Sequence, residues 1–521
     1  MVHDTYSLDI ENFQEKIQRA ANLVSQHIEH ISDAPVVGQK SYEDILSHIA
    51  HEMPWDGCGI DCVIDDVEKQ IMPLATRIGH PRFLAWITTS PAPAGTLGEI
   101  LCTGLNQAPL SFKGGPVATV LENIVLRWFN DMLHFPQDAG GTIVSGGTMG
   151  NLMGLTVARH VHFPEVKEQG LWALKKKPVM YCSDQGHMSI ERSAMQLGLG
   201  TSSVRAIQSD NACGNKATCR INIEALRKAI EEDMQAGHAP FCVVGQAGTT
   251  VAGAVDDLDA LADICAEYGL WLHVDAAYGG AALLTDHGKK VMKGIERADS
   301  VCIDPHKWFF IPLECGCTLF RNKEQQLSTF RASAAYLGVE NPYDLKNTTF
   351  MLSRANRALK VWCAFRTYGM NKIKAIVERN MASARLFHDL CEQSPHWKNL
   401  HAVTLSMSSA QFLPPSIQCT DGTNTCIHKT SFNSTQESSA QDHSIWTLDA
   451  LNKLQLAILK RLEQSGLAFV TPAMMAGQAG VRLCVANHRT TDTDIRLIFD
   501  MITRFGLELA EEYEAAHKVN I

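Results

Sequence analysis

The middle of the chain alternates short apolar runs with stretches of helical periodicity, and no other feature restricts the fold as much. Between about Thr96 and Arg366, strand-like runs recur at 141–145, 179–182, 241–245, 270–275 and 301–303. Strands that are separated by helices can pair in parallel, because a parallel pair needs a long crossover connection. The pattern predicts an α/β fold over residues 96–366, with a mostly parallel sheet flanked by helices.

The segment before this region, residues 1–95, is predicted to be helical. Helical periodicity runs over about 10–49 and again over 60–78. These helices have too little apolar surface to form a domain alone. We expect them to pack on the rest of the chain or on a second copy of it.

The segment after it, residues 367–521, is predicted to form a smaller α+β domain. It mixes strand-like runs with helical patterns at 448–466 and 492–512. Residues 414–443 differ from their surroundings because Ser, Thr, Asn and Gln dominate there. Such a stretch buries little apolar area, so it predicts a mobile polar surface loop with no chemical role.

Composition and charge exclude several classes of partner. The 521 residues carry a formal net charge of −10, and the pI is about 6.1, which disfavours binding to nucleic acid or to an anionic membrane. No stretch approaches the roughly 18 apolar residues of a membrane span. The first residues lack the basic start and apolar core of a secretory signal. A cytoplasmic protein that acts on a small metabolite is the expectation.

The cysteines do not predict a metal site. The chain has 16 of them, scattered along its length. Close pairs such as Cys58 with Cys62, or Cys315 with Cys317, lack the matching second half of a structural zinc site. Reduced and mostly buried thiols are therefore predicted.

Two of the strand-like runs deliver a reactive side chain at their C-terminal ends. The run 271–275 ends in Asp275, and the run 300–303 is followed by Pro305, His306, Lys307 and Trp308. In an open α/β sheet this edge is where ligands bind. A lysine with a remote carboxylate is what pyridoxal phosphate chemistry needs, since the amine forms a Schiff base and the acid keeps the pyridine nitrogen protonated. An enzyme with this cofactor is the leading hypothesis.

Four further features fit such a site, although each is weak alone. Gly147, Thr148 and Met149 follow an apolar run and open a helical pattern, where main-chain amides could approach a phosphate. His187, just after a strand, could stack on the pyridine ring, although a lone histidine is more often structural. Further along, Thr249 could hydrogen-bond to the ring hydroxyl or touch the substrate, and the small side chain of Ala277 could support the ring.

Taken together and in order, these motifs resemble the group II pyridoxal-phosphate-dependent amino-acid decarboxylases. The resemblance runs from about His80 to Thr491. It implies fold type I and a homodimer with active sites at the subunit interface, in which the opening helices clasp the partner. It also implies cofactor contacts, which by residue are Lys307 as the Schiff base, Asp275 at the pyridine nitrogen, His187 and Ala277 on the two ring faces, Thr249 near the ring hydroxyl, Gly147, Thr148 and Met149 at the phosphate, and His306 beside the phosphate and the substrate carboxylate.

The reaction expected from this resemblance is removal of the α-carboxylate of an L-amino acid as carbon dioxide. Tyr336 lies 29 residues after Lys307 (336 − 307), where these decarboxylases carry a tyrosine that returns a proton to the α-carbon. Relatives with phenylalanine there tend towards aldehyde formation. Aldehyde synthesis, transamination and a non-catalytic scaffold remain the alternatives.

The side chain of the substrate is the least constrained point. The resemblance assigns Trp86 to the side-chain pocket and places Leu110 and Lys113 in the stretch contributed by the other subunit. Lys113 and Arg82 could meet an acidic side chain, although structural ion pairs are the commoner role of such residues. Arg482 resembles a family arginine that approaches the substrate carboxylate. Acidic, heteroaromatic and aromatic amino acids all stay open.

Overall fold

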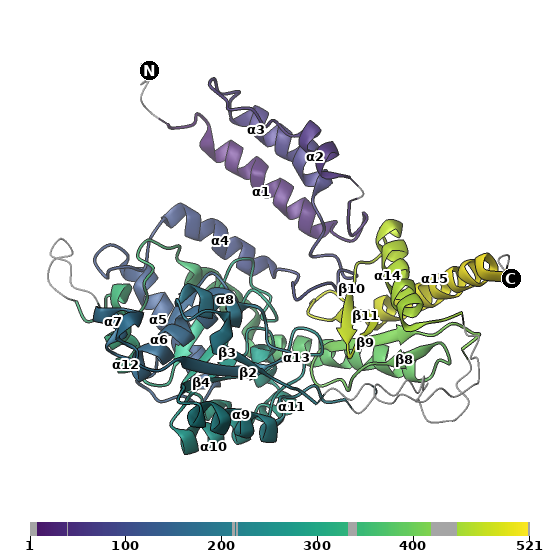
Figure 1. Ribbon diagram of the computed structural model, residues 1–521. Helices are drawn as coiled ribbons and strands as arrows, with labels where there is room; N and C mark the ends of the chain where they lie inside the picture. The colour runs from purple at the N-terminus through teal and green to yellow at the C-terminus, as the bar shows by residue number, and fades with distance from the viewer. Residues whose placement is uncertain are drawn as a thin grey trace, which may run out of the picture.

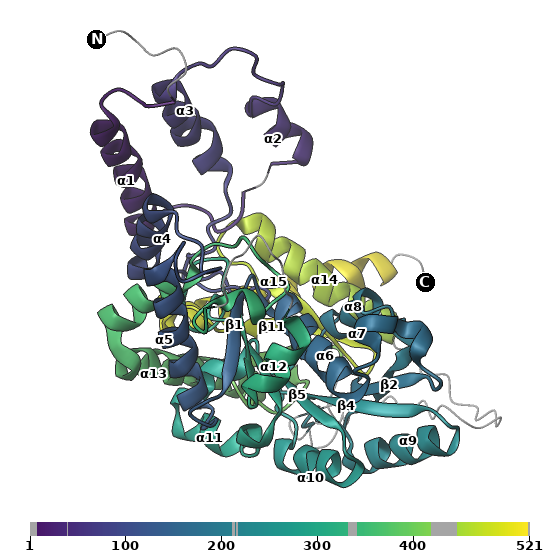
Figure 2. The same ribbon diagram turned by 90° about the vertical axis from the view of Figure 1, so that its left-hand side faces the viewer.

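The computed structural model describes residues 8–38, 40–210, 214, 217–331, 341–417 and 445–518. Figures 1 and 2 show a large body around one sheet, a smaller body around a second sheet, and a group of N-terminal helices that projects from both. No described helix has both the length and the apolar character needed to cross a membrane.

Seven of the described strands form the main sheet, in the order β1-β7-β6-β5-β4-β2-β3. The pairs within β6-β5-β4-β2-β3 are parallel, and β7 runs antiparallel to both of its neighbours. The sheet is therefore mostly parallel, as predicted. Its strands are β1 (Gly140–Val144), β2 (Pro178–Ser183), β3 (Val204–Ile207), β4 (Ala239–Gln246), β5 (Trp271–Asp275), β6 (Ser300–Ile303) and β7 (Gly316–Phe320).

Helices cover both faces of this sheet. Alternate residues of a strand point to opposite faces, so in β4 the side chains of Cys242 and Val244 pack with α6 and α8, while Val243 packs with α5, α9 and α10. The helices of this region are α4 (Pro93–Leu105), α5 (Pro116–Met132), α6 (Gly147–His162), α7 (Val166–Gln169), α8 (Ser189–Gln196), α9 (Ile223–Gln235), α10 (Leu258–Tyr268), α11 (Asp286–Val291), α12 (Lys323–Phe330) and α13 (Arg357–Glu392). Buried on both faces, the strands read as continuous apolar runs.

The second sheet is antiparallel and has the order β10-β11-β9-β8. It packs against the second half of α13 and against two later helices through a separate apolar core. Its elements are β8 (Trp397–Asn399), β9 (Met407–Phe412), β10 (Thr471–Met475), β11 (Gln478–Cys484), α14 (Leu448–Ser465) and α15 (Asp492–Lys518). Gly369, whose φ of 70° is not helical, interrupts α13.

The first helical pattern is broken where the sequence predicted continuity over 10–49. The structure forms α1 (Phe13–Glu29) and α2 (Tyr42–His48), with an irregular link between them. Pro35 lies in that link and has no main-chain N–H to donate. Its neighbour Val36 donates instead to the carbonyl of Gly466 at the end of α14, over 2.8 Å.

The second helical pattern, predicted over 60–78, forms α3 (Ile60–Asp66) and then changes pitch in the short turns η1 (Val67–Ile71) and η2 (Met72–Leu74). No side chain of α1 is buried in this chain. The group α1, α2 and α3 stands clear of the main body in both views.

Candidate active site

A cavity of about 460 Å³ opens at the C-terminal edge of the main sheet, where β5 and β6 end. Asp275 is the last residue of β5, and Lys307 follows β6 by one short turn. Both line the cavity, together with the start of α6 and with His187, which follows β2. The side chains that the sequence placed at this edge are brought together as the parallel topology requires.

Asp275 is held by two hydrogen-bond donors. Its Oδ2 accepts from Nδ2 of Asn151 over 2.7 Å, and its Oδ1 accepts from the main-chain N–H of Ala277 over 3.1 Å. Only 7% of Asp275 is exposed. Both carboxylate oxygens are therefore held by fixed donors at one end of the cavity.

Lys307 presents the amine. Its Nζ lies 3.2 Å from Oδ2 of Asp304. Burial alone would lower the pKa of Lys307, but the charges of Asp304 and Asp275 and the hydrogen bond to Asp304 outweigh it, so the pKa is raised. The next residue, Trp308, anchors the turn, because its fully buried indole stacks on Tyr278 and donates to Oδ1 of Asn380 over 3.0 Å.

The start of α6 forms a cradle of the kind that binds a phosphate. Gly146, the residue before the helix, offers no side chain to cap it. A Cβ at Gly147 would lie 2.8 Å from Oδ2 of Asp304, so only glycine fits there. The N–H of Gly147 donates to that same oxygen over 2.9 Å, which leaves the amides of Thr148 and Met149 for an anion.

Two half-buried histidines flank the cavity. Burial lowers the pKa of His187, against the opposing charge of Asp275, and lowers the pKa of His306 as well. Nδ1 of His306 lies 2.7 Å from the carbonyl of Cys315, which fixes the ring beside the cradle. Ala277 lines the cavity next to Gly147. The site thus fits pyridoxal phosphate. It offers an amine for the aldehyde, a remote carboxylate for the pyridine nitrogen, an anion cradle for the phosphate and a flat ring for one face of the pyridine.

Several residues assigned to the site from the sequence lie elsewhere in the described chain. Thr249 is fully buried, and its hydroxyl accepts from the N–H of Ala254 over 3.0 Å; the neighbouring Thr250 lines the cavity instead. The turn after β4 therefore presents the second threonine rather than the first. Tyr336 lies outside the described residues.

The residues assigned to substrate binding are also absent from the described cavity wall: Trp86, Leu110, Lys113 and Arg482. Arg82 donates to the carbonyl of Leu467 and pairs with Asp494, so it has a structural role. Arg482 donates to the carbonyls of Thr250 and Trp86. Lys113 is exposed.

Sequence reasoning missed other wall residues: Asn151, Gln246, Tyr278, Asp304, Leu313 and Glu314. Two signals were available. Asp304 directly precedes the Pro-His-Lys-Trp motif, and Asn151 lies one helical turn after Gly147, on the face that turns towards the sheet.

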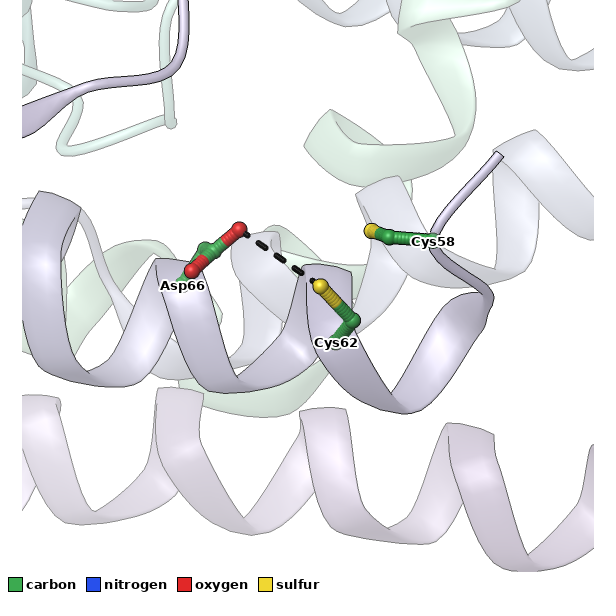
Figure 3. A group of neighbouring side chains, drawn as sticks. All are labelled: Cys58, Cys62 and Asp66. Atoms are coloured by element: carbon green, nitrogen blue, oxygen red, sulfur yellow. Dashed lines mark hydrogen bonds between the residues drawn. The ribbon is translucent and has the colours of Figure 1, made fainter. Parts of the chain in front are cut away.

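Outside this cavity, Cys58, Cys62 and Asp66 form a group at α3, with one ligand atom of each within 4.8 Å of the others (Figure 3). The thiol of Cys62 contacts Oδ2 of Asp66 over 3.9 Å. Hydrogen bonding with Cys58, and then burial and nearby negative charges, raise the pKa of Cys62 to about 11, so this thiol stays protonated at neutral pH. Three donors are also one fewer than a closed zinc site has.

Comparison with known proteins identifies the family. The pyridoxal-dependent decarboxylase conserved domain matches residues 43–407. The aromatic-L-amino-acid decarboxylase of Bacillus atrophaeus is 29% identical over 515 residues, 98% of each chain. Phenylacetaldehyde synthase of a Rosa hybrid cultivar is 28% identical over 94% of this chain and 93% of its own. The crystal structure of mouse CSAD is similar with a TM-score of 0.85 at 24% identity, over 95% of this chain and 98% of that one. The chain therefore belongs to the pyridoxal-dependent decarboxylases, enzymes that use pyridoxal phosphate to decarboxylate amino acids.

Proposed function

We propose that this enzyme releases the α-carboxylate of an aromatic or heteroaromatic L-amino acid as carbon dioxide and leaves the amine. The observation that carries the proposal is the placement of Lys307 and Asp275 on one cavity, with the cradle of α6 beside them. When bound, pyridoxal phosphate supplies the electron sink for the bond that breaks. Lys307 would hold its aldehyde carbon, and Asp275 would keep its ring nitrogen protonated.

The cavity wall favours an uncharged substrate side chain over an acidic one. Among the described residues that line it, Lys307 is the one lysine or arginine, and its amine is committed to the cofactor. The candidate cations Arg82 and Arg482 donate to protein carbonyls instead. Ile87 and Leu313 supply apolar surface. An acidic substrate would leave a buried charge unpaired, which is costly.

A screen of L-amino acids tests this proposal. Each is incubated with the enzyme and pyridoxal phosphate, and carbon dioxide, amine, aldehyde and ammonia are measured together. We expect carbon dioxide and amine in equal amounts from an aromatic or heteroaromatic amino acid. Activity confined to acidic amino acids would reject the substrate class. Borohydride reduction and peptide mapping should place a pyridoxyl group on Lys307, and its absence there would reject the site.

Aldehyde synthesis is the second candidate, because one relative carries the name phenylacetaldehyde synthase. We propose that Tyr336 favours the amine by returning a proton to the α-carbon. In Tyr336→Phe, dioxygen dissolved in the buffer would act as the two-electron oxidant, and the products should shift from amine towards aldehyde, ammonia and hydrogen peroxide. Aldehyde as the main product of the unmodified enzyme would favour the second candidate.

We also propose that the active form is a homodimer joined through the N-terminal helices and through α4. Apolar side chains stand exposed along α4, including Leu97 at 62% and Leu101 at 57%. A row of this kind is typical of an interface. Leu97→Glu with Leu101→Glu should lower the mass measured by light scattering from dimer to monomer. Leu456→Glu, on α14 and 50% exposed, is the matched control and should leave the mass unchanged.

A further inference from the structure

A chain of buried polar side chains runs beneath the cavity floor, from the core of the sheet to His187. Each link is a hydrogen bond of 2.8 to 2.9 Å between side chains. Asp275 joins it as a branch at Asn151. The members in order are Trp271, Ser300, His273, Asn151, Ser189 and His187.

The first bonds begin at Trp271. An indole N–H can only donate, so Oγ of Ser300 accepts from it over 2.9 Å, and the hydroxyl proton of Ser300 can go to Nδ1 of His273, 2.8 Å away. Because a hydroxyl oxygen can accept two bonds, Trp271 permits Nδ1 of His273 to be an acceptor, and the orientation of Asn151 decides it. In a neutral imidazole the proton then lies on Nε2, which donates to Oδ1 of Asn151 over 2.9 Å.

The carboxylate branch fixes this direction. An ionised carboxylate can only accept, so the amide of Asn151 must turn its NH2 group towards Asp275. The second proton of that NH2 group goes to Oγ of Ser189 over 2.8 Å. Ser189 then has its hydroxyl proton free for Nδ1 of His187, 2.8 Å away, and its main-chain N–H points at the same nitrogen over 3.2 Å.

We propose that Asn151 and His273 are positioning residues that hold His187 in one tautomer, with its proton on Nε2. The bonds on either side of Asn151 cannot reverse, because Asp275 cannot donate and so fixes which way the amide of Asn151 points. Nδ1 of His187 is thereby fully used, and Nε2–H is the donor that the ring offers on the cavity side. This Nε2–H would donate a hydrogen bond to an anionic oxygen, such as that of a substrate carboxylate.

Burial and packing support this assignment. His273 and Ser300 are fully buried, and Asn151 is 1% exposed, so water is poorly placed to replace any of the three. Burial lowers the pKa of His273 to about 4, which keeps the ring neutral. On α6, a Cβ at Gly154 would lie 2.5 Å from Cε1 and Nδ1 of His273, so this glycine makes room for the ring.

The spectrum of the enzyme labelled with 15N in its histidine rings tests the hydrogen-bond order directly. The signals of His187 and His273 are assigned by their loss in single variants. For both rings we expect Nδ1 in the unprotonated range and Nε2 in the protonated range at neutral pH. A proton on Nδ1 of His187, or a doubly protonated His273, would overturn the inference.

A matched pair of variants separates positioning from packing. His273→Gln keeps an amide N–H near the place of Nε2, whereas His273→Leu keeps the volume and removes the donor. In His273→Leu we expect a mixture of His187 tautomers and a kcat about tenfold lower with KM little changed, as for other tautomer-fixing partners. His273→Gln should restore the single tautomer and most of kcat. An unchanged His187 tautomer in His273→Leu would reject the role of His273.

The benefit for the substrate rests on the proposed function, whereas the hydrogen-bond order does not. Expected tautomers in an enzyme that releases no carbon dioxide would reject the decarboxylation and leave this inference standing. Decarboxylation together with the opposite His187 tautomer would reject this inference and leave the function standing.

Discussion

Asp275→Asn is the substitution that best tests the site, because it keeps the shape of the side chain and removes its charge. Each carboxylate oxygen accepts one bond, Oδ2 from Asn151 and Oδ1 from the N–H of Ala277. However the new amide turns, its NH2 group faces one of these two donors. A buried donor left without an acceptor costs about 1–3 kcal/mol of unfolding free energy.

Rotation of Asn151 would not relieve this mismatch. Its NH2 group would then meet the protonated Nε2 of His273, so the conflict would move one bond further along the chain of side chains. The loss of charge acts separately on the reaction, because the cofactor nitrogen loses the partner that stabilises its proton. Removing one preorganised electrostatic partner of this kind typically lowers kcat by about 10²–10³-fold.

The assay is carbon dioxide release per folded active site, with the substrate found in the screen and with pyridoxal phosphate in excess. Asp233→Asn is the matched control, since Asp233 is a buried carboxylate that accepts from Tyr181 and Arg205 away from the cavity. We expect the control to lose stability while keeping kcat. A kcat for Asp275→Asn within about threefold of the unmodified enzyme would refute the electrostatic role of Asp275.

Three further outcomes follow from packing and burial. Arg354→Met should lower the unfolding free energy in urea by about 3–5 kcal/mol, because it leaves the buried Glu122 unpaired, and adding Glu122→Leu should recover most of that loss. Gly154→Ala should destabilise the protein by displacing His273, whereas Gly104→Ala, with open space around it, should be neutral or stabilising by up to about 1 kcal/mol. The urea midpoint should fall between pH 6.5 and 4, since four buried or half-buried neutral histidines lose stability as the pH drops towards their lowered pKa values. Asp256, with a pKa raised to about 6, and Asp299, whose pKa burial also raises, act in the opposite direction but are two groups against four, and a flat profile would contradict this. These four histidines, each with a pKa lowered to about 4 by burial, are His80, His273, His401 and His488.

The sequence predicted the parts of the fold whose signal is local. Five strands of the main sheet, β1, β2, β4, β5 and β6, were predicted to within two residues at each end, because each is a buried apolar run bounded by turn residues. Two strands were missed. Val204–Ile207 is a partly exposed edge strand that contains Arg205, and Gly316–Phe320 begins with glycine and lies antiparallel in a parallel pattern.

The candidate site likewise contains residues that local sequence predicts and residues that depend on tertiary packing. Lys307 and Asp275 were predictable because the end of a parallel strand determines where its next side chain lies. The choice between Thr249 and Thr250 depends on the course of one turn, which residue type does not reveal. The role of Asn151 depends on how α6 packs across β5 and β6. The hydrophobic periodicity of the sequence does not determine this tertiary packing.

Arg482 shows why a charged residue is the hardest to interpret from sequence. Its guanidinium is 5% exposed and donates to the carbonyls of Thr250 and Trp86, which ties β11 of the small sheet to two segments of the cavity region. Because Thr250 lines the cavity, this arginine shapes the wall through the main chain without lining it. Burial lowers the pKa of Arg482, yet a guanidinium stays charged in proteins. The sequence shows the charge of Arg482 but not its two carbonyl partners, because these lie in segments 232 and 396 residues away along the chain.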